Sequence, residues 1–114
     1  MNKIKRSVCP IACTLDIIGD RWTMLVVRDL FLGRKYFKDF LSSPESISTN
    51  ILTDRLNRLA EAGILEASPD PATVGRCIYL LTDKGRTLLP LLESIKEWGL
   101  TNIKGTSVRL KSYA

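Results

Sequence analysis

The feature that most constrains the fold of this chain is a change in its apolar pattern at Gly63. Before that glycine, apolar residues recur every three or four positions, which is the spacing of one face of an α-helix. After it come two short runs rich in β-forming residues, 64–68 and 76–81, joined by the loop 69–75. A two-stranded hairpin is only marginally stable alone, so this one has to pack on the helices. The pattern therefore predicts a mainly helical α+β domain with one small hairpin.

Residues that begin and end helices divide the helical part of the chain. Pro10 suits a first helical turn, and Asp20 and Ser48 suit N-terminal caps because their side-chain oxygens can accept backbone N–H groups. Pro90 lies within the last helical pattern and should kink that helix or divide it in two. The predicted helices span residues 9–18, 21–32, 36–41, 49–62 and 83–99.

Alternation along the second strand predicts which of its side chains face the core. Cys77, Tyr79 and Leu81 would point inward, which leaves Ile78 and Leu80 facing outward. An apolar outer face needs cover, and we expect the C-terminal tail or a partner subunit to supply it.

Three helices, a tight turn, a capped helix, a hairpin and a final helix follow one another in the order of a winged helix-turn-helix. In that fold the helix 49–62 would be the recognition helix, and the loop 69–75 would be the wing. Short polar side chains on the outer face of this helix allow a close approach to base edges. Polar outer faces are also usual on ordinary surface helices, so this face alone indicates no more than a solvated helix. The expected buried stripe is Leu52, Leu56, Leu59 and Ala60, and the expected polar face is Thr49, Asn50, Thr53, Asp54 and Asn57.

Charge and composition narrow the classes of function. The 114 residues include 17 Lys and Arg, 12 Asp and Glu, and no histidine, which gives a net charge of +5. Without histidine the chain has no Ser-His-Asp triad, Cys-His pair or imidazole metal site. It also has no cluster of paired carboxylates and no Gly-rich phosphate loop, so we expect no catalytic residues, no metal site and no resident cofactor.

The chain lacks an apolar run approaching the roughly 18–20 residues that span a bilayer, and we interpret it as cytoplasmic, with no membrane partner. Its three cysteines form no C-x-x-C pair, which does not fit a secreted disulfide framework. We divide the chain into a basic arm at 1–8, a DNA-binding and dimerisation domain at 9–99 and a basic tail at 100–114.

Several segments, in colinear order over about residues 9–99, resemble the HxlR-type regulators. The resemblance implies a bacterial winged-helix transcription factor that binds a roughly palindromic operator in double-stranded DNA as a homodimer. The chain departs from the family in its apolar strand positions Ile78 and Leu80 and in a wing that lacks basic residues. The segments that carry the resemblance are Cys9-Pro10, 15–22, 28–33, 47–56, 59–63, 81–85, Leu89-Pro90 and Trp98-Gly99.

The resemblance also implies a set of DNA-contacting residues. For Arg55 the alternative is an intramolecular ion pair with Asp54, Glu61 or Asp39, and the same reservation applies to Arg58. Residues implied to face the major groove or its phosphates are Ser48, Thr49, Asn50, Thr53 and Arg55, with Arg58 as a weaker candidate. Residues implied to meet the DNA backbone are Lys35, Tyr36 and Lys38, and Arg76 would reach a flanking phosphate or the minor groove.

Cys9 is a candidate sensor of oxidants or electrophiles, because in some relatives a cysteine just before this proline has that role and links subunits. A thiol at a helix N-terminus is favoured as the thiolate by the helix dipole. The alternative is an inert cysteine. Cys13, one turn later, is poorly placed to form a disulfide with Cys9, so a partner thiol in a second subunit is the better candidate. We expect Cys77 to lie in the core.

The last helix carries more apolar side chains than one hairpin can cover, which predicts a homodimer formed through the terminal helices. Such a dimer would place two recognition helices about one turn of DNA apart, roughly 34 Å. Any effector would be an oxidant or a small molecule. The alternative function, supported by Ile78, Leu80 and the uncharged wing, is a winged-helix module that binds proteins instead of DNA.

Overall fold

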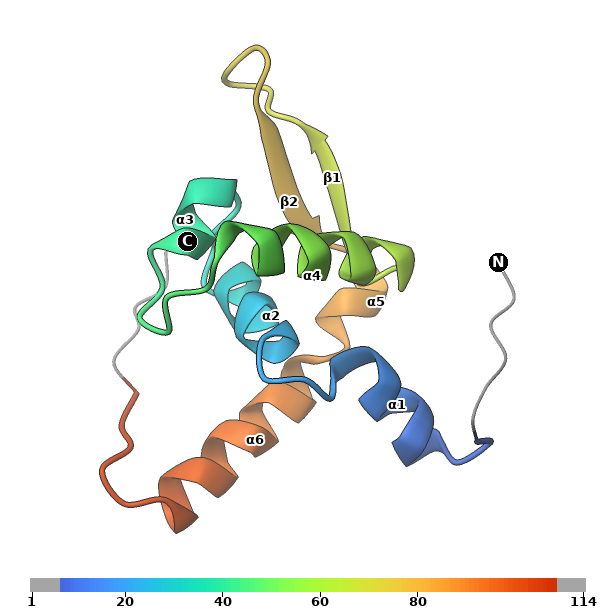
Figure 1. Cartoon of the computed structure of the whole chain (residues 1–114), viewed down its shortest axis with the longest axis vertical. Helices are drawn as coiled ribbons and strands as arrows, with labels where there is room; N and C mark the ends of the chain where they lie inside the picture. Colours follow the sequence, from blue (N-terminus) through green and yellow to red (C-terminus); the bar gives the residue numbers. More distant parts are fainter. Residues whose placement is uncertain (1–6, 109–114) are drawn as a thin grey trace.

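The structure is a computed structural model, and it describes residues 7–108. Within this range, helices and a single antiparallel hairpin follow one another in the predicted order, which confirms the expected α+β class (Figure 1). The helices are α1 Pro10–Ile18, α2 Thr23–Phe31, α3 Phe37–Leu41, α4 Thr49–Glu61, α5 Asp83–Arg86 and α6 Leu89–Asn102, and the strands are β1 Leu65–Pro69 and β2 Cys77–Leu81.

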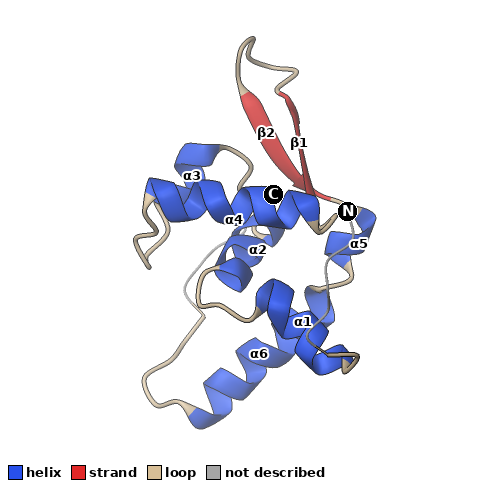
Figure 2. Cartoon of the chain, turned by 45° about the vertical axis from the view of Figure 1, so that its right-hand side comes forward, coloured by secondary structure: helices blue, strands red, loops and turns tan. Residues whose placement is uncertain are grey.

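Helix α4 crosses the middle of the molecule, and the other elements lie on either side of it. The hairpin projects from one side of α4, and α1 and α6 lie on the other side (Figures 1 and 2). The core forms where α2, α3, α4 and the start of β1 meet, so α4 buries one face and leaves the opposite face on the surface. The largest fully buried side chains are Phe40, Leu52, Leu59 and Val27.

Local signals explain where α4 begins and ends. The Ser48 hydroxyl accepts the N–H of Ile51 at 3.2 Å, and Gly63 takes a φ of +76° just beyond the last turn. Ala60 is exposed, so its expected burial is wrong. Each helical residue is rotated by about 100° from the one before it, which turns Ala60 away from the buried line. The buried line itself is confirmed as Leu52, Leu56 and Leu59.

The hairpin differs from the expected strand faces at two positions. Ile78, expected to face outward, is only 6% exposed, and Cys77, expected in the core, is exposed. The N–H of Tyr79 donates to the carbonyl oxygen of Lys35 at 2.9 Å, so the segment before α3 runs along the outer edge of β2. The alternation of apolar residues within a strand does not report which distant segment covers it, so the burial of Ile78 could not be predicted from that pattern. The remaining positions match the expectation: Tyr79 and Leu81 pack on the core, and Leu80 is exposed.

A compact joint fixes the end of α4 to α5 and so orients the hairpin between them. The Lys84 ammonium donates to the carbonyl oxygen of Ala62 at 2.7 Å, and the Thr82 hydroxyl donates to that of Ile64 at 3.1 Å. Gly85 packs so closely that an added Cβ would lie 2.0 Å from the Ile64 carbonyl oxygen. This contact explains why a glycine stands at that position.

Pro90 divides the last helical pattern in two, as predicted, because α5 ends before it and α6 starts with the proline in its first turn. Helix α6 continues past Gly99, its predicted end, to Asn102. The predicted arm at 1–8 and tail at 100–114 lie partly outside the described residues.

Candidate nucleic-acid interface

The outer face of α4 is a row of short polar side chains. Each side chain of the row is exposed, and the α4 ribbon runs along the surface below the hairpin (Figure 1). The Thr53 hydroxyl donates to the Thr49 carbonyl oxygen at 2.9 Å, which leaves its lone pairs directed outward as acceptors. A face of this kind can approach base edges closely. Its members are Thr49, Asn50, Thr53 and Asn57, with Ser48 at the N-terminal cap.

The basic residues of α4 are held by carboxylates, in what we call the α4 clamp: Asp20, Asp54, Arg55 and Arg58. The Arg55 Nε lies 3.0 Å from Asp20 Oδ1, and its Nη1 contacts Asp54. Arg58 lies farther from Asp54, with Nη1 3.6 Å from Oδ2. The expected ion-pair alternative for Arg55 is therefore present with Asp54, while the pair with Asp20 was missed. DNA contact by Arg55 stays a prediction.

Asp20 joins two helices at once. Its Oδ1 accepts the N–H groups of Trp22 at 2.8 Å and Thr23 at 3.0 Å, which confirms the predicted cap of α2, and the same oxygen binds Arg55 of α4. Burial acts to raise the pKa of Asp20, but hydrogen bonds from Thr23, Trp22 and Arg55 outweigh it and hold the pKa well below 3.8. The carboxylate therefore stays charged and ties α4 to the start of α2.

A second group, which we call the wing-base cluster, joins the start of α3 to the two ends of the wing loop: Lys35, Tyr36, Lys38, Asp70 and Arg76. The Arg76 guanidinium carbon lies 4.0 Å from the centre of the Tyr36 ring, and Lys35 Nζ lies 5.7 Å from it. The Tyr36 hydroxyl donates to Asp70 Oδ2 at 2.9 Å. The hydrogen bond to Asp70 raises the pKa of Tyr36, and the N–H of Ala72 leads the causes that lower the pKa of Asp70.

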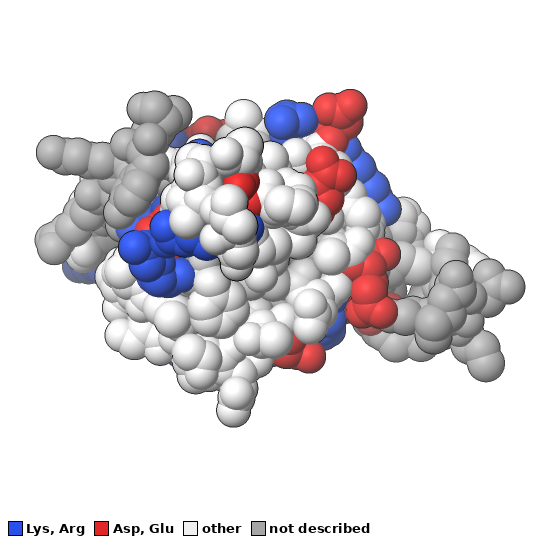
Figure 3. Space-filling model, turned by 90° about the horizontal axis from the view of Figure 1, so that it is seen from above, with Lys and Arg blue, Asp and Glu red and all other residues white. Residues whose placement is uncertain are grey.

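The three cations of the wing-base cluster form no close ion pair with a described carboxylate, although the charges of Lys35 and Arg76 help to lower the pKa of Asp70. Within residues 7–108, no Asp or Glu oxygen lies within ion-pair distance of Lys35, Lys38 or Arg76. Seen from above the hairpin, one group of Lys and Arg atoms lies close against one side of it, while the opposite side shows most of the visible Asp and Glu atoms together with further Lys and Arg atoms (Figure 3). Lys35 and Arg76 are thus brought together at the Tyr36 ring, and Lys38 follows two residues later in α3, whereas Arg55 and Arg58 belong to the α4 clamp.

Asp70 is a functional candidate that sequence reasoning missed. It is only 7% exposed, although it stands in the wing. Its position between two prolines signals a turn, and its Oδ1 accepts the N–H of Ala72 at 2.9 Å, as such turns require. No sequence signal paired Asp70 with Tyr36, which lies 34 residues earlier.

A buried polar network fixes the turn that precedes α4. Arg34 donates to the Ser43 hydroxyl at 2.7 Å and to the Asp39 carbonyl oxygen at 2.9 Å, and Ser43 donates to Asp29. Arg28 adds a two-pronged contact to Glu45, at 2.8 and 2.9 Å. The turn is therefore held at both ends, and it sets the angle at which α4 leaves the core.

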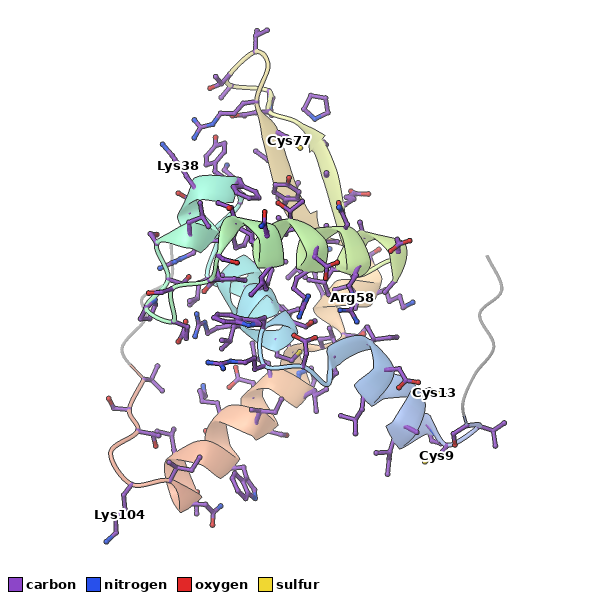
Figure 4. The ribbon with its side chains drawn as sticks, in the orientation of Figure 1. Cys9, Cys13, Lys38, Arg58, Cys77 and Lys104 are labelled. Carbon is purple, nitrogen blue, oxygen red and sulfur yellow. The ribbon has the colours of Figure 1, made fainter. Side chains whose placement is uncertain are left out.

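The cysteines occupy two separate places. Cys9 is exposed at the N-terminal cap of α1, and Cys13, one turn later, donates through Sγ to the Ser7 carbonyl oxygen at 3.2 Å. Cys77 lies on the hairpin, far from both (Figure 4). Its expected place in the core is wrong, because Cys77 pairs with Pro69 at the loop end of the hairpin, beyond the core.

The terminal helices present apolar side chains to the outside. Helix α6 has no buried residue at all, and Trp98 is 65% exposed. The apolar surface of α1 is similarly open. The largest exposed apolar side chains on these two helices are Ile11, Leu15, Ile17, Leu89, Leu91, Ile95, Trp98 and Leu100.

Comparison with known proteins decides the family. The sequence profile of the HxlR-like helix-turn-helix matches residues 17–107. The chain belongs to the HxlR-like helix-turn-helix family. It is 35% identical to the HTH-type transcriptional regulator YybR of Bacillus subtilis over 94 residues, which cover 82% of this chain and 75% of YybR. As an HxlR-like protein with such relatives, it is a DNA-binding transcriptional regulator, and its fold is the winged helix-turn-helix predicted from the order of elements.

Solved structures of similar proteins agree with this assignment. PA1607 superposes with a TM-score of 0.83 at 42% identity, over 92% of this chain and 75% of that one. The redox regulator HypR in its reduced form superposes with a TM-score of 0.76 at 34% identity, over 84% of this chain and 95% of that one. The HxlR-like fold is therefore shared along most of the chain.

Within the residues that the structure describes, no three His, Cys, Asp or Glu side chains are grouped to hold a metal ion. In the same range, every helix is too short or too polar to cross a membrane.

Proposed function

We propose that this HxlR-like regulator binds a roughly palindromic site in double-stranded DNA as a homodimer, with α4 in the major groove and the wing-base cluster on the flanking backbone. The observation that carries the proposal is the combination of two surfaces. The polar row runs along α4, and three cations with no ion-pair partner within residues 7–108 lie on α3 and the hairpin, on the side of α4 away from α1 and α6 (Figure 1). Short polar groups read bases and free cations bind phosphates, so this surface supplies both kinds of contact.

Individual roles follow from the surroundings of each residue. Asn50 and Thr53 are placed to meet base edges, and Ser48 and Thr49 stand at the helix N-terminus, where backbone N–H groups attract a phosphate. A phosphate contact by Arg55 or Arg58 would have to compete with Asp20 and Asp54. We therefore assign these two arginines mainly to the orientation of α4. The free cations Lys35, Lys38 and Arg76 would bind the DNA backbone.

The homodimer is supported by the apolar surfaces of α1 and α6. A 14-residue helix with no buried residue has little to hold it in a single chain, and a second copy would cover it. Such pairing leaves α4 free on the opposite side of the molecule (Figure 2). We assign residues 9–99 to binding and dimerisation, 1–8 and 100–114 to basic extensions, and the working compartment to the cytoplasm, where the DNA would be.

We also propose that Cys9 makes the regulator responsive to oxidants. Its exposed thiol at a helix N-terminus is accessible, and the similar protein HypR is a redox regulator with reduced and oxidised forms. Cys77 is too far away in the same chain to be its partner (Figure 4). Two thiols from two subunits would give up two hydrogen atoms to the oxidant and form one intersubunit disulfide.

The test is selection of genomic DNA fragments by the purified protein, with and without diamide, which oxidises two thiols and is itself reduced to a hydrazine. We expect a discrete pseudo-palindromic site whose binding changes on oxidation in the wild type and in Cys77→Ser, but not in Cys9→Ser. If DNA binding is the same with and without diamide, the proposed sensing role of Cys9 is contradicted, while the proposed DNA-binding role is not. Failure to enrich any site at low salt would contradict the DNA-binding mode proposed here.

A further inference from the structure

Arg76 has an aromatic ring as its partner and not a carboxylate, as does Arg21, which lies 5.1 Å from the centre of the Trp22 ring. Arg28, Arg55 and Arg86 each lie within 3.0 Å of a carboxylate oxygen, whereas Arg76 stacks on the Tyr36 ring at 4.0 Å. A carboxylate occupies the N–H donors of a guanidinium and cancels its charge. An aromatic ring contacts only the flat face, so the charge and the N–H edge of Arg76 stay available to another acceptor.

Tyr36 is itself fixed from the side of the wing. Its hydroxyl donates to Asp70 Oδ2 at 2.9 Å, and the other oxygen of Asp70 accepts the N–H of Ala72 at 2.9 Å. The N–H of Asp70 donates to the carbonyl oxygen of Arg76 at 2.8 Å, which closes the loop. Tyr36, Asp70 and Arg76 therefore form one closed set that spans the helix-turn-helix and the hairpin.

The wing offers no substitute for Arg76. The loop 69–75 contains no basic residue, and Val74 at its tip is fully exposed. Any attraction between this end of the hairpin and a phosphate therefore depends on a single guanidinium. Holding that group in place before binding lowers the entropy lost when it meets DNA.

We propose that Tyr36 and Asp70 are positioning residues that aim Arg76 at a DNA backbone phosphate flanking the site bound by α4. The inference rests on the proposed function. It adds a role for Asp70, an acidic residue that cannot itself attract a phosphate. Because Asp70 is buried and hydrogen-bonded, its charge orients the tyrosine instead of facing the DNA. Stacking on the ring leaves the N–H edge of the guanidinium available to an acceptor, whereas a direct ion pair with a carboxylate would occupy it.

The test is a double-mutant cycle on DNA affinity, measured by fluorescence anisotropy at several salt concentrations. The probes are the duplex enriched in the genomic selection and a duplex of unrelated sequence and equal length. We expect Arg76→Gln to weaken binding to both duplexes by roughly tenfold and to lower the salt slope by about one. Tyr36→Phe, which keeps the ring and loses the hydroxyl, should weaken binding by about threefold, and Asp70→Asn should match it.

The decisive measurement is the same pair of changes made with Arg76→Gln already present. If Tyr36 and Asp70 act through the arginine, their effect should fall below about 1.5-fold in that background. Tyr79→Phe is the matched control, because it removes the same hydroxyl from a ring that packs on Phe40 and does not touch Arg76. Its affinity should equal that of the wild type.

Two results would overturn the inference. Losses from Tyr36→Phe that persist in full beside Arg76→Gln would show that the tyrosine acts on DNA directly or through the fold. Thermal unfolding separates these two cases, and either one removes the positioning role. A wild type with no salt-dependent binding to either duplex would overturn the proposed function together with this inference, whereas additive losses in a chain that binds DNA overturn the inference alone.

Discussion

The wing-base cluster and the α4 clamp use the same residue types in opposite ways. In the clamp, Arg55 and Arg58 face carboxylates, and Asp20 and Asp54 take up their charge. In the wing-base cluster, Arg76 rests on an aromatic ring, and Asp70 binds a hydroxyl and a backbone N–H instead of a cation. The clamp therefore fixes the position of α4, while the cluster keeps its positive charge for a ligand.

The number of basic residues therefore overstates the positive charge that is available to bind DNA. Two of the basic residues closest to the recognition face are already neutralised by the protein itself. Removing one of them should cost stability, and removing a free cation should cost affinity.

The largest effect on DNA binding is expected for reversal of a free charge. Lys38→Glu should weaken binding by roughly 30-fold at moderate salt, because it replaces attraction to a phosphate by repulsion. Lys104→Glu is the matched control, since it makes the same charge change at the far end of α6 (Figure 4). Titration of a labelled duplex measures both affinities. Equal losses in the two variants would mean that only net charge matters.

The next effect is on stability. Arg55→Gln should lower the free energy of unfolding by about 2 kcal/mol, because it leaves the partly buried Asp20 carboxylate without its cation. Arg58→Gln, whose side chain is half exposed, should lower it by less than about 0.5 kcal/mol. Urea unfolding of both variants gives the values. The distinction between the two arginines fails if they destabilise the fold equally.

Acid should weaken the clamp in a predictable direction. The folded-state pKa of Asp20 lies below its ordinary value of 3.8, so its stabilisation is complete above that pH and is lost as pH falls through the folded-state pKa. Asp20→Asn should therefore be less stable than the wild type at neutral pH, with a gap that narrows between about pH 5 and pH 2. Urea midpoints across this range measure the gap. A gap that is constant with pH would show that charge plays no part.

The smallest effect is expected at the tip of the wing. Val74→Lys adds a cation to a fully exposed position in a loop that has none. Affinity should rise by about two- to threefold at low salt, and the gain should vanish at high salt. Val8→Lys, at an equally open position before α1, is the control that should give no gain. A gain of the same size in both would contradict a local contact by the wing.

The order of elements and their ends could be predicted from sequence because these depend on local signals. Asp20 and Ser48 cap the predicted helices, and Pro90 divides the last one. The contacts that define the two clusters are different in kind. Tyr36 meets Asp70 across 34 residues, and Arg55 meets Asp20 across 35. Such pairs depend on how the helices and the hairpin pack against one another. The periodicity of apolar residues within each element carries no information on that packing.

The same limit explains the error on the second strand. Alternation correctly assigned Tyr79 and Leu80, and it failed at Ile78 and Cys77. The segment around Lys35 runs along β2, and the strand extends beyond the core at Cys77. Burial there is set by neighbours outside the hairpin, so the burial of Ile78 removes part of the support for a protein-binding module.

Helix α6, which buries none of its residues in one chain, has a consequence for how this protein melts. Fourteen residues make a helix that is marginal in water unless something covers it. If a second copy is that cover, folding and association are one equilibrium, and mass action applies to both. The melting temperature should then rise with protein concentration, and dilution alone should loosen the end of the molecule that lies farthest from the DNA.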